Sequence, residues 1–234
     1  MTNELSLLLL TAATVGFMHT ILGPDHYVPF IAMSKTGDWS KFKTAWVTIL
    51  CGLGHVGSTI VLGFVGIAFG YSVFHLQNIE SYRGDIAGWL LIIFGLLYTV
   101  WGIRRAFLNK PHSHKHIHHD GIMEVHSHDH HNNHVHEETK STMRLWFLFT
   151  IFVFGPCEPL IPVLMYPAAR GTLTDVVIVC LVFSLVTIGT MLGIVFSALY
   201  GLSFVPMKKM EQYSHALGGF AILMCGIAVQ FMGL

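Results

Sequence analysis

Apolar residues dominate six long stretches of this 234-residue chain, and short polar segments separate them. A helix needs about 20 predominantly apolar residues to cross a bilayer, and each stretch is close to or above that length. The pattern predicts an all-α integral membrane protein with six transmembrane helices in the lipid bilayer. The predicted spans cover residues 6–33, 44–73, 85–107, 144–169, 174–205 and 213–234.

The composition supports a membrane location. Charged residues make up 11% of the chain, whereas a soluble domain carries about a quarter. The formal net charge is zero, and we expect no nucleic-acid partner. The four cysteines, Cys51, Cys157, Cys180 and Cys225, all lie in apolar segments without a CxxC pair. We therefore expect them to pack as small hydrophobic residues rather than to form a disulfide framework.

Basic residues predict the orientation of the chain. Eleven lysines and arginines fall in or beside the loops after the first, third and fifth spans, and only Arg83 and Arg170 fall on the opposite side. The positive-inside rule places the central loop in the cytoplasm and both termini outside, in a bacterial-type inner or cell membrane. The eleven are Lys35, Lys41, Lys43, Arg104, Arg105, Lys110, Lys115, Lys140, Arg144, Lys208 and Lys209.

Two segments of the chain resemble each other. "GPDHYVPFIAM" at 23–33 aligns with "GPCEPLIPVLM" at 155–165, which sets Asp25 opposite Cys157. Three spans per half would make the halves enter the membrane from opposite sides, so we expect two inverted three-helix repeats with Gly/Pro-broken first and fourth helices. The predicted divisions are a first repeat at 1–108, a loop at 109–143 and a second repeat at 144–234.

Five ionisable residues inside the predicted spans are candidate metal ligands: His19, Asp25, His26, His55 and Glu158. Burying a charged side chain at mid-membrane costs about 2.5–3.5 kcal/mol on insertion scales, so such residues are functional candidates by default. Imidazole with carboxylate suits Ni²⁺, Co²⁺, Zn²⁺ or Fe²⁺ better than Mg²⁺ or Ca²⁺. Thr20 and Cys157 are further candidates, as ligands or as residues that orient the ligands.

A helix break explains how two of these histidines can meet. His19 and His26 are seven residues apart, which on a straight helix is about 10 Å. Pro24 lies between them; it lacks an N–H and clashes with the carbonyl of Thr20, so the helix kinks or unwinds there. The break is expected to bring the two rings together and to free backbone carbonyls.

The central loop is rich in histidine. Eleven of the sixteen histidines lie between residues 112 and 136, beside acidic residues. Such a segment cannot form a packed core, but its imidazoles make an accessory metal-binding region. These histidines are His112, His114, His116, His118, His119, His126, His128, His130, His131, His134 and His136.

At these residues the chain resembles the nickel/cobalt transporter families and related urease-linked membrane accessory proteins. Their hallmark is a histidine closely followed by an Asp-His pair in an early membrane segment. Here His19 is followed by "TILGP" and then Asp25-His26, one residue more than the usual four-residue spacer. The resemblance implies that His19, Asp25 and His26 are metal-site residues and that His55 matches a histidine of the second span.

A second resemblance concerns "FGPCEPLIP" at 154–162. It is similar to the Gly-Pro-Cys element of membrane electron transporters of the wider superfamily, which pass reducing equivalents through paired intramembrane cysteines. The position that matches Cys157 in the first half is Asp25, so the two repeats cannot form a dithiol. The expected architecture is shared, whereas the expected redox chemistry is not.

We therefore expect a secondary transporter that moves a divalent transition-metal cation by alternating access, and not an enzyme. Ni²⁺ or Co²⁺ is favoured by the resemblance, with Zn²⁺, Fe²⁺ and Mn²⁺ as alternatives, and no fixed cofactor is expected. Imidazole must be neutral to bind metal, so protons compete with the ion and are the expected coupling ion. The cytoplasmic His-rich loop favours efflux over uptake.

Three other classes stay open. A membrane electron transporter would need an essential cysteine pair. An anion (sulfite-type) exporter would need cationic groups or helix N-termini, and no lysine or arginine falls well inside a predicted span. A metal sensor or chaperone without transport would act through the central loop. The pattern does not predict the oligomeric state.

Overall fold

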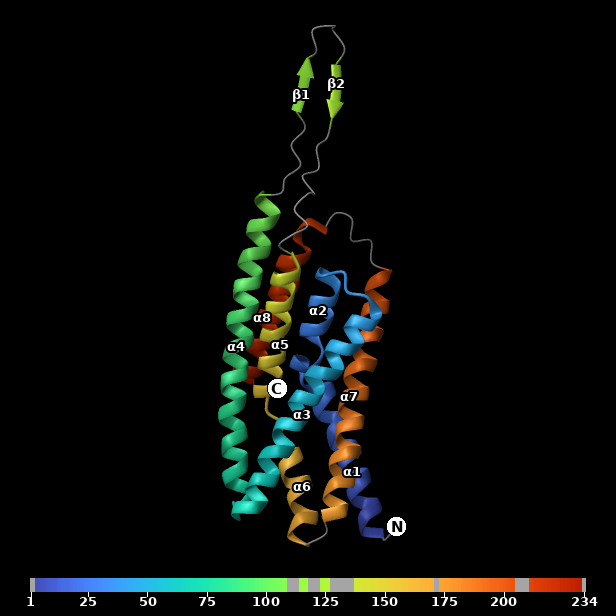
Figure 1. The fold of residues 1–234 in the computed structure, drawn as a ribbon, viewed down its shortest axis with the longest axis vertical. Helices are drawn as coiled ribbons and strands as arrows, with labels where there is room; N and C mark the ends of the chain where they lie inside the picture. The colour runs from blue at the N-terminus through green and yellow to red at the C-terminus, as the bar shows by residue number, and fades with distance from the viewer. Residues whose placement is uncertain are drawn as a thin grey trace.

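The computed structural model describes residues 3–108, 114–117, 123–126, 137–170, 173–204 and 211–232. Helices form nearly all of this part of the chain, and they run along one common direction (Figure 1). They are α1 (Asn3–Leu22), η1 (Pro24–His26), α2 (Val28–Thr36), α3 (Lys41–Phe69), α4 (Val73–Leu108), α5 (Glu137–Phe154), α6 (Leu160–Ala169), α7 (Leu173–Ser203), η2 (Glu211–Tyr213) and α8 (Ser214–Met232). A short antiparallel hairpin, β1 (His114–Ile117) and β2 (Met123–His126), projects beyond one end of the bundle.

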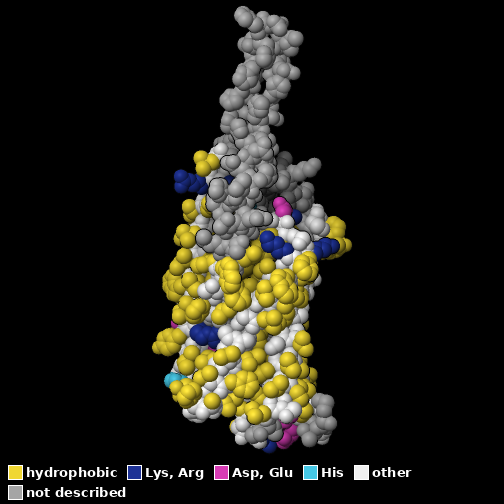
Figure 2. Space-filling view, in the orientation of Figure 1, with side chains coloured by type: hydrophobic (Ala, Val, Ile, Leu, Met, Phe, Trp, Pro, Cys, Tyr) yellow, Lys and Arg dark blue, Asp and Glu magenta, His cyan; other side chains and the backbone are white. Residues whose placement is uncertain are grey.

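The predicted membrane character is confirmed. Five of the described helices, α1, α3, α4, α7 and α8, are long and apolar enough to cross a membrane. The predicted span at 144–169 is instead divided into two shorter apolar helical segments, Leu145–Phe154 and Leu160–Ala169. Hydrophobic side chains cover most of the visible surface of the bundle, while the visible lysines and arginines gather mainly towards the hairpin end (Figure 2).

Both predicted helix breaks are present. The first separates α1 from α2 at Gly23-Pro24, and the second separates α5 from α6 at Gly155-Pro156. In each case the glycine N–H still donates to a carbonyl four residues earlier, 3.0 Å from His19 O and 2.8 Å from Ile151 O. The proline that follows has no N–H to continue this ladder, so the helix stops at that residue.

The third membrane helix begins earlier than the hydrophobic pattern predicts. It starts at Val73 rather than at 85, and it therefore includes Glu80 and Arg83. The side chain of Glu80 is fully buried and that of Arg83 is 16% exposed. Two predictions are corrected here. Arg83 does not lie in a loop, and a largely buried arginine does lie inside a membrane helix.

Packing places α3 at the centre of the bundle. It contacts α5, α6 and α7, while α1 packs along α7 and α4 packs along α8. The largest core cluster joins Val56 of α3, Phe183 of α7 and Cys157 and Leu160 from the α5–α6 region. The middle of α3 and the second helix break consequently face the same interior region.

Candidate functional site

Three histidines meet in the interior, as the sequence predicts. His19 comes from the end of α1, His26 from η1 and His55 from the middle of α3. The ring centroids are 4.6 Å apart for His19 and His26, 4.8 Å for His26 and His55, and 6.0 Å for His19 and His55. His26 and His55 are both 2% exposed. We call these three side chains the histidine cluster.

The break at Gly23-Pro24 turns His26 back towards its own chain. A Cβ atom at Gly23 would lie 2.5 Å from His26 Nδ1, so only glycine allows this close approach. His26 Nδ1 lies 3.1 Å from the carbonyl oxygen of Gly23 and 3.0 Å from Oδ1 of Asp25. Both neighbours are acceptors, so Nδ1 carries the proton and donates. The break thus fixes the orientation of the imidazole.

A second hydrogen bond links His26 to His55. Their Nε2 atoms are 3.2 Å apart, so one of the two rings donates a proton and the other accepts it. Asp25, His26 and His55 therefore form a continuous hydrogen-bonded chain. A carboxylate that accepts from one nitrogen of a histidine fixes the tautomer and the orientation of the ring.

Cys157 completes the cluster from the second half of the chain. Its side chain is fully buried, and ligand atoms of His19, His55 and Cys157 all lie within 4.8 Å of one another. The Nε2 atom of His19 is buried and has no hydrogen-bond partner among the described residues. A Cβ atom at Gly155 would lie 2.9 Å from His55 Nδ1, so the second break, like the first, makes room for an imidazole.

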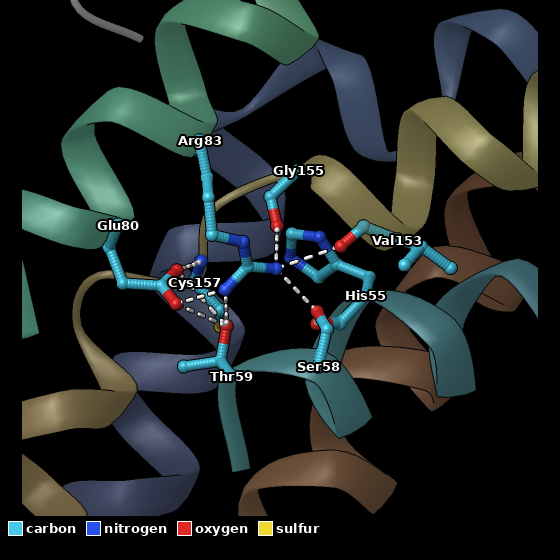
Figure 3. A network of polar contacts seen from close by, with 8 residues as sticks. All are labelled: His55, Ser58, Thr59, Glu80, Arg83, Val153, Gly155 and Cys157. Carbon is cyan, nitrogen blue, oxygen red and sulfur yellow. Dashed lines mark hydrogen bonds and ion pairs between the residues drawn. The ribbon is translucent and has the colours of Figure 1, made fainter. Parts of the chain in front are cut away.

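A buried ion pair holds the second break in place (Figure 3). The Arg83 guanidinium donates to the Glu80 carboxylate, and its remaining bonds reach groups on α3 and at the end of α5. These further acceptors are the hydroxyls of Ser58 and Thr59 and the carbonyl oxygens of Val153, at 2.8 Å, and Gly155, at 3.4 Å. The guanidinium therefore satisfies carbonyls that the end of α5 leaves without helical partners.

Glu80 connects the same network to Cys157. Its Oε2 accepts the backbone N–H of Cys157 at 2.9 Å and the hydroxyl of Thr59 at 3.1 Å. The carboxylate is thus fully engaged by an arginine, a backbone amide and a hydroxyl, as a buried charge requires. Through these bonds α4 sets the position of the Gly155-Pro156-Cys157 segment beside the histidine cluster.

A small cavity of about 10 Å³ lies next to the cluster, enough for about one water molecule. Asp25 and His55 provide its polar lining, and Leu91, Ile151 and Phe152 are among its apolar neighbours. The cavity therefore lies between Asp25, at one end of the hydrogen-bonded chain, and the interior face of α4.

Other predicted site residues lie apart from the cluster. Glu158 is exposed, although it directly follows the buried Cys157. The Thr20 hydroxyl is buried but donates to Gly16 O of its own helix at 2.7 Å. The side chains of the predicted loop histidines at 112–136 lie outside the described residues. The structure therefore brings together His19, Asp25, His26, His55 and Cys157, and leaves Glu158 outside.

Sequence reasoning missed Glu80 and Arg83. Both residues lie in the polar stretch "HLQNIESYRGD" at 75–85, which is not apolar enough to predict a membrane span. The available signal was their i, i+3 spacing, which places an acid and a base on one helix face. Since each neutralises the other, the pair can be buried where either residue alone could not.

The fold and this centre define a helical membrane protein with a buried polar core at two helix breaks. The model of one protein family, described as "Cytochrome C biogenesis protein transmembrane region", matches residues 27–228. The chain belongs to this family, which is a family of membrane electron transport. No curated protein and no solved structure is a significant match to the chain.

This membership corrects two predictions. The resemblance to nickel/cobalt transporters and urease-linked proteins was wrong, and so was the expected function of divalent metal-cation transport. The motif at His19, Asp25 and His26 had one residue too many in its spacer. Histidine and aspartate residues also occur in buried polar centres of other kinds. The element at Gly155-Pro156-Cys157 was the better indicator, because it pointed to the membrane electron transporters.

Proposed function

We propose that this protein carries reducing equivalents across the membrane. The observation that carries the proposal is the family match over residues 27–228, which includes His55, the second helix break and Cys157. The buried Cys157 thiol lies within 4.8 Å of ligand atoms of His19 and His55 inside the membrane bundle, and this arrangement supports the passage of electrons there. We retain the expectation that the protein acts as a carrier rather than as an enzyme.

The arrangement of the helices supports an inverted repeat. In Figure 1 the first broken helix passes through α1 and then α2 towards the hairpin end, whereas α5 and then α6 run the opposite way. The packing pairs correspond under such a symmetry, because α1 contacts α7 as α5 contacts α3, and α2 contacts α8 as α6 contacts α4. We propose two inverted three-helix halves, with the hairpin end in the cytoplasm and both termini outside.

The centre departs from a dithiol carrier. The four cysteines are buried and free, and Asp25, not a cysteine, matches Cys157 in the first half. We propose that Cys157, together with the histidine cluster, takes the place of a cysteine pair. The overall exchange is balanced: two thiols on one side become a disulfide and release two electrons and two protons, and a disulfide on the other side takes up both pairs.

Vesicles test this function directly. Purified protein is reconstituted into vesicles that contain an impermeant disulfide dye, and an impermeant protein dithiol is added outside. We expect dye reduction well above that of protein-free vesicles. Cys157→Ser should lower the rate at least about tenfold, because the thiolate is the reactive form of the side chain. Cys225→Ser is the matched control, since Cys225 is a buried thiol of α8.

Two results would contradict the proposal. One is dye reduction by the wild-type protein at the rate of protein-free vesicles. The other is a Cys157→Ser variant that elutes as a monodisperse folded protein and reduces the dye as fast as the Cys225→Ser control.

A further inference from the structure

We propose that His19, His55 and Cys157 bind one soft or borderline transition-metal ion as a resident group, with copper as the first choice. The inference rests on the proposed function, because it names the group that would hold an electron at the membrane centre. It concerns a fixed ion and not a transported one. The three residues come from α1, α3 and the α5–α6 break, so they converge from three directions.

The spacing of the three ligands fits a metal ion. Metal–nitrogen and metal–sulfur bonds of about 2.0–2.3 Å place two ligands of one tetrahedral ion about 3.3–3.8 Å apart. Ligand atoms of His19, His55 and Cys157 already lie within 4.8 Å of one another. A shift of about 1 Å in side-chain positions would therefore bring all three ligand atoms within bonding distance of one ion.

The unpartnered nitrogen of His19 is the second observation. Its Nε2 is buried with no hydrogen-bond partner among the described residues, and buried polar atoms in native proteins nearly always have one. His19 also lies next to the other two residues rather than facing lipid. A metal ion would satisfy this nitrogen together with the Cys157 sulfur.

The donor set favours particular metals. Two imidazoles and one thiolate are the ligands of copper electron-transfer sites, and they also suit Zn²⁺, whereas Mg²⁺ and Ca²⁺ require oxygen ligands. Asp25 and His26 lie behind His55 in the hydrogen-bonded chain. Metal-bound imidazoles are commonly oriented by a hydrogen bond from their other ring nitrogen, and here His26, itself bonded to Asp25, makes that bond to His55.

A bound copper ion would supply a one-electron carrier, so two successive electrons would pass for each dithiol oxidised outside. The protein's own residues would hold the ion, exclude water and keep the imidazoles in place. Burial of Cys157 and His55, and the small size of the adjacent cavity, fit such a closed site.

Titration of the purified full-length protein with Co²⁺, and separately with Cu⁺, tests the site. Cobalt bound to a thiolate gives a charge-transfer absorption that histidines cannot give, and the His-rich segment at 112–136 contains no cysteine. The signal therefore reports binding to a thiolate independently of that segment. We expect it to saturate at about one cobalt per chain, and Cu⁺ to displace the cobalt, because a soft thiolate ligand selects Cu⁺.

Three variants locate the site. Cys157→Ser should abolish the charge-transfer signal, and Cys225→Ser should leave it unchanged. His19→Gln should weaken cobalt binding at least about tenfold, a loss that even residues behind the ligands can cause. His19 makes no hydrogen bond to the described residues that its loss would break, so this variant tests the site even if Cys157→Ser fails to fold.

The outcomes separate this inference from the proposed function. Absence of the signal in the wild-type protein, or its persistence in folded Cys157→Ser and in His19→Gln, overturns the metal site, even when vesicles reduce the dye normally. Stoichiometric binding that Cys157→Ser abolishes and His19→Gln weakens supports the site, even when the wild-type vesicles fail to reduce the dye and the proposed function is lost.

Discussion

Replacing Glu80 by glutamine removes the negative charge of the buried ion pair while keeping the shape of the side chain. Glu80 is fully buried and Arg83 is 16% exposed, so the arginine would lose its counter-ion in a site that water barely reaches. The remaining acceptors of Arg83, namely Ser58, Thr59 and two carbonyls, are neutral. The perturbation therefore isolates the charge of Glu80 from its volume.

The expected cost follows from the geometry. Leaving one partner of a buried ion pair uncompensated costs about 3–5 kcal/mol. The carbonyl oxygen of glutamine can still accept either from Cys157 N–H or from Arg83, which limits further losses. The partial exposure of Arg83 and its hydrogen bonds to carbonyls favour the lower end. We expect Glu80→Gln to lower the free energy of unfolding by about 3 kcal/mol, roughly a hundredfold in the folding equilibrium.

Reversible unfolding in mixed detergent micelles, followed by the loss of helical circular dichroism, measures this change. Asp85→Asn is the matched control: Asp85 lies on the same helix, is exposed, and among the described residues accepts a single bond, from Gln230 at 3.3 Å. We expect that control to stay within about 0.5 kcal/mol of the wild type.

A double variant completes the test. Replacing Glu80 and Arg83 together by methionine removes both charges and should recover much of the lost stability, because a buried pair can often be exchanged for apolar residues at little cost. The reasoning would be refuted if Glu80→Gln stayed within about 1 kcal/mol of the wild type, or if the double variant were as unstable as the single variants Glu80→Met and Arg83→Met added together.

Two further predictions concern the helix breaks and a helix start. Gly155→Ala places a Cβ 2.9 Å from His55 Nδ1, so we expect about 1–3 kcal/mol of overpacking and a melting temperature several degrees lower. Gly57→Ala on α3 meets nothing within 4 Å, so its melting temperature should hardly change. Equal melting temperatures for the two variants would rule out close packing at this break. Ser40 caps α3, since its hydroxyl accepts from Lys43 N at 3.2 Å. Ser40→Ala should lower the free energy of unfolding by about 1 kcal/mol in the same detergent assay, and Ser40→Asn should restore most of this loss. A stability that does not distinguish alanine from asparagine at this position would contradict the capping role.

The sequence predicts that His19 and His26 meet because the cause is local. Pro24 lies between His19 and His26, and a proline break is a steric consequence that needs no knowledge of the rest of the fold. The same reasoning finds the break at Pro156. A straight helix would hold His19 and His26 about 10 Å apart, and the break brings their ring centroids to 4.6 Å.

Other parts of the site depend on tertiary structure. Cys157 is buried and Glu158 is exposed, yet they are neighbours in an irregular segment, where no helical or strand periodicity indicates which side chain points inward. The direction is set instead by the bond from Cys157 N–H to Glu80, a residue 77 positions away in the chain. Glu80 and Arg83 were missed because a hydropathy average counts each of them as a polar residue, although the two charges neutralise each other in the folded protein.

The histidine cluster and Cys157 are synthesised far apart in the chain. His19, His26 and His55 enter the membrane with the first half of the chain, whereas Cys157 arrives only with the second. Neither half contains the complete set, so the set can form only after late helices have settled against early ones. A signal that requires both the histidine cluster and Cys157 would therefore report when the last stage of folding in the membrane is complete. Two separately expressed halves should regain that signal only when they associate.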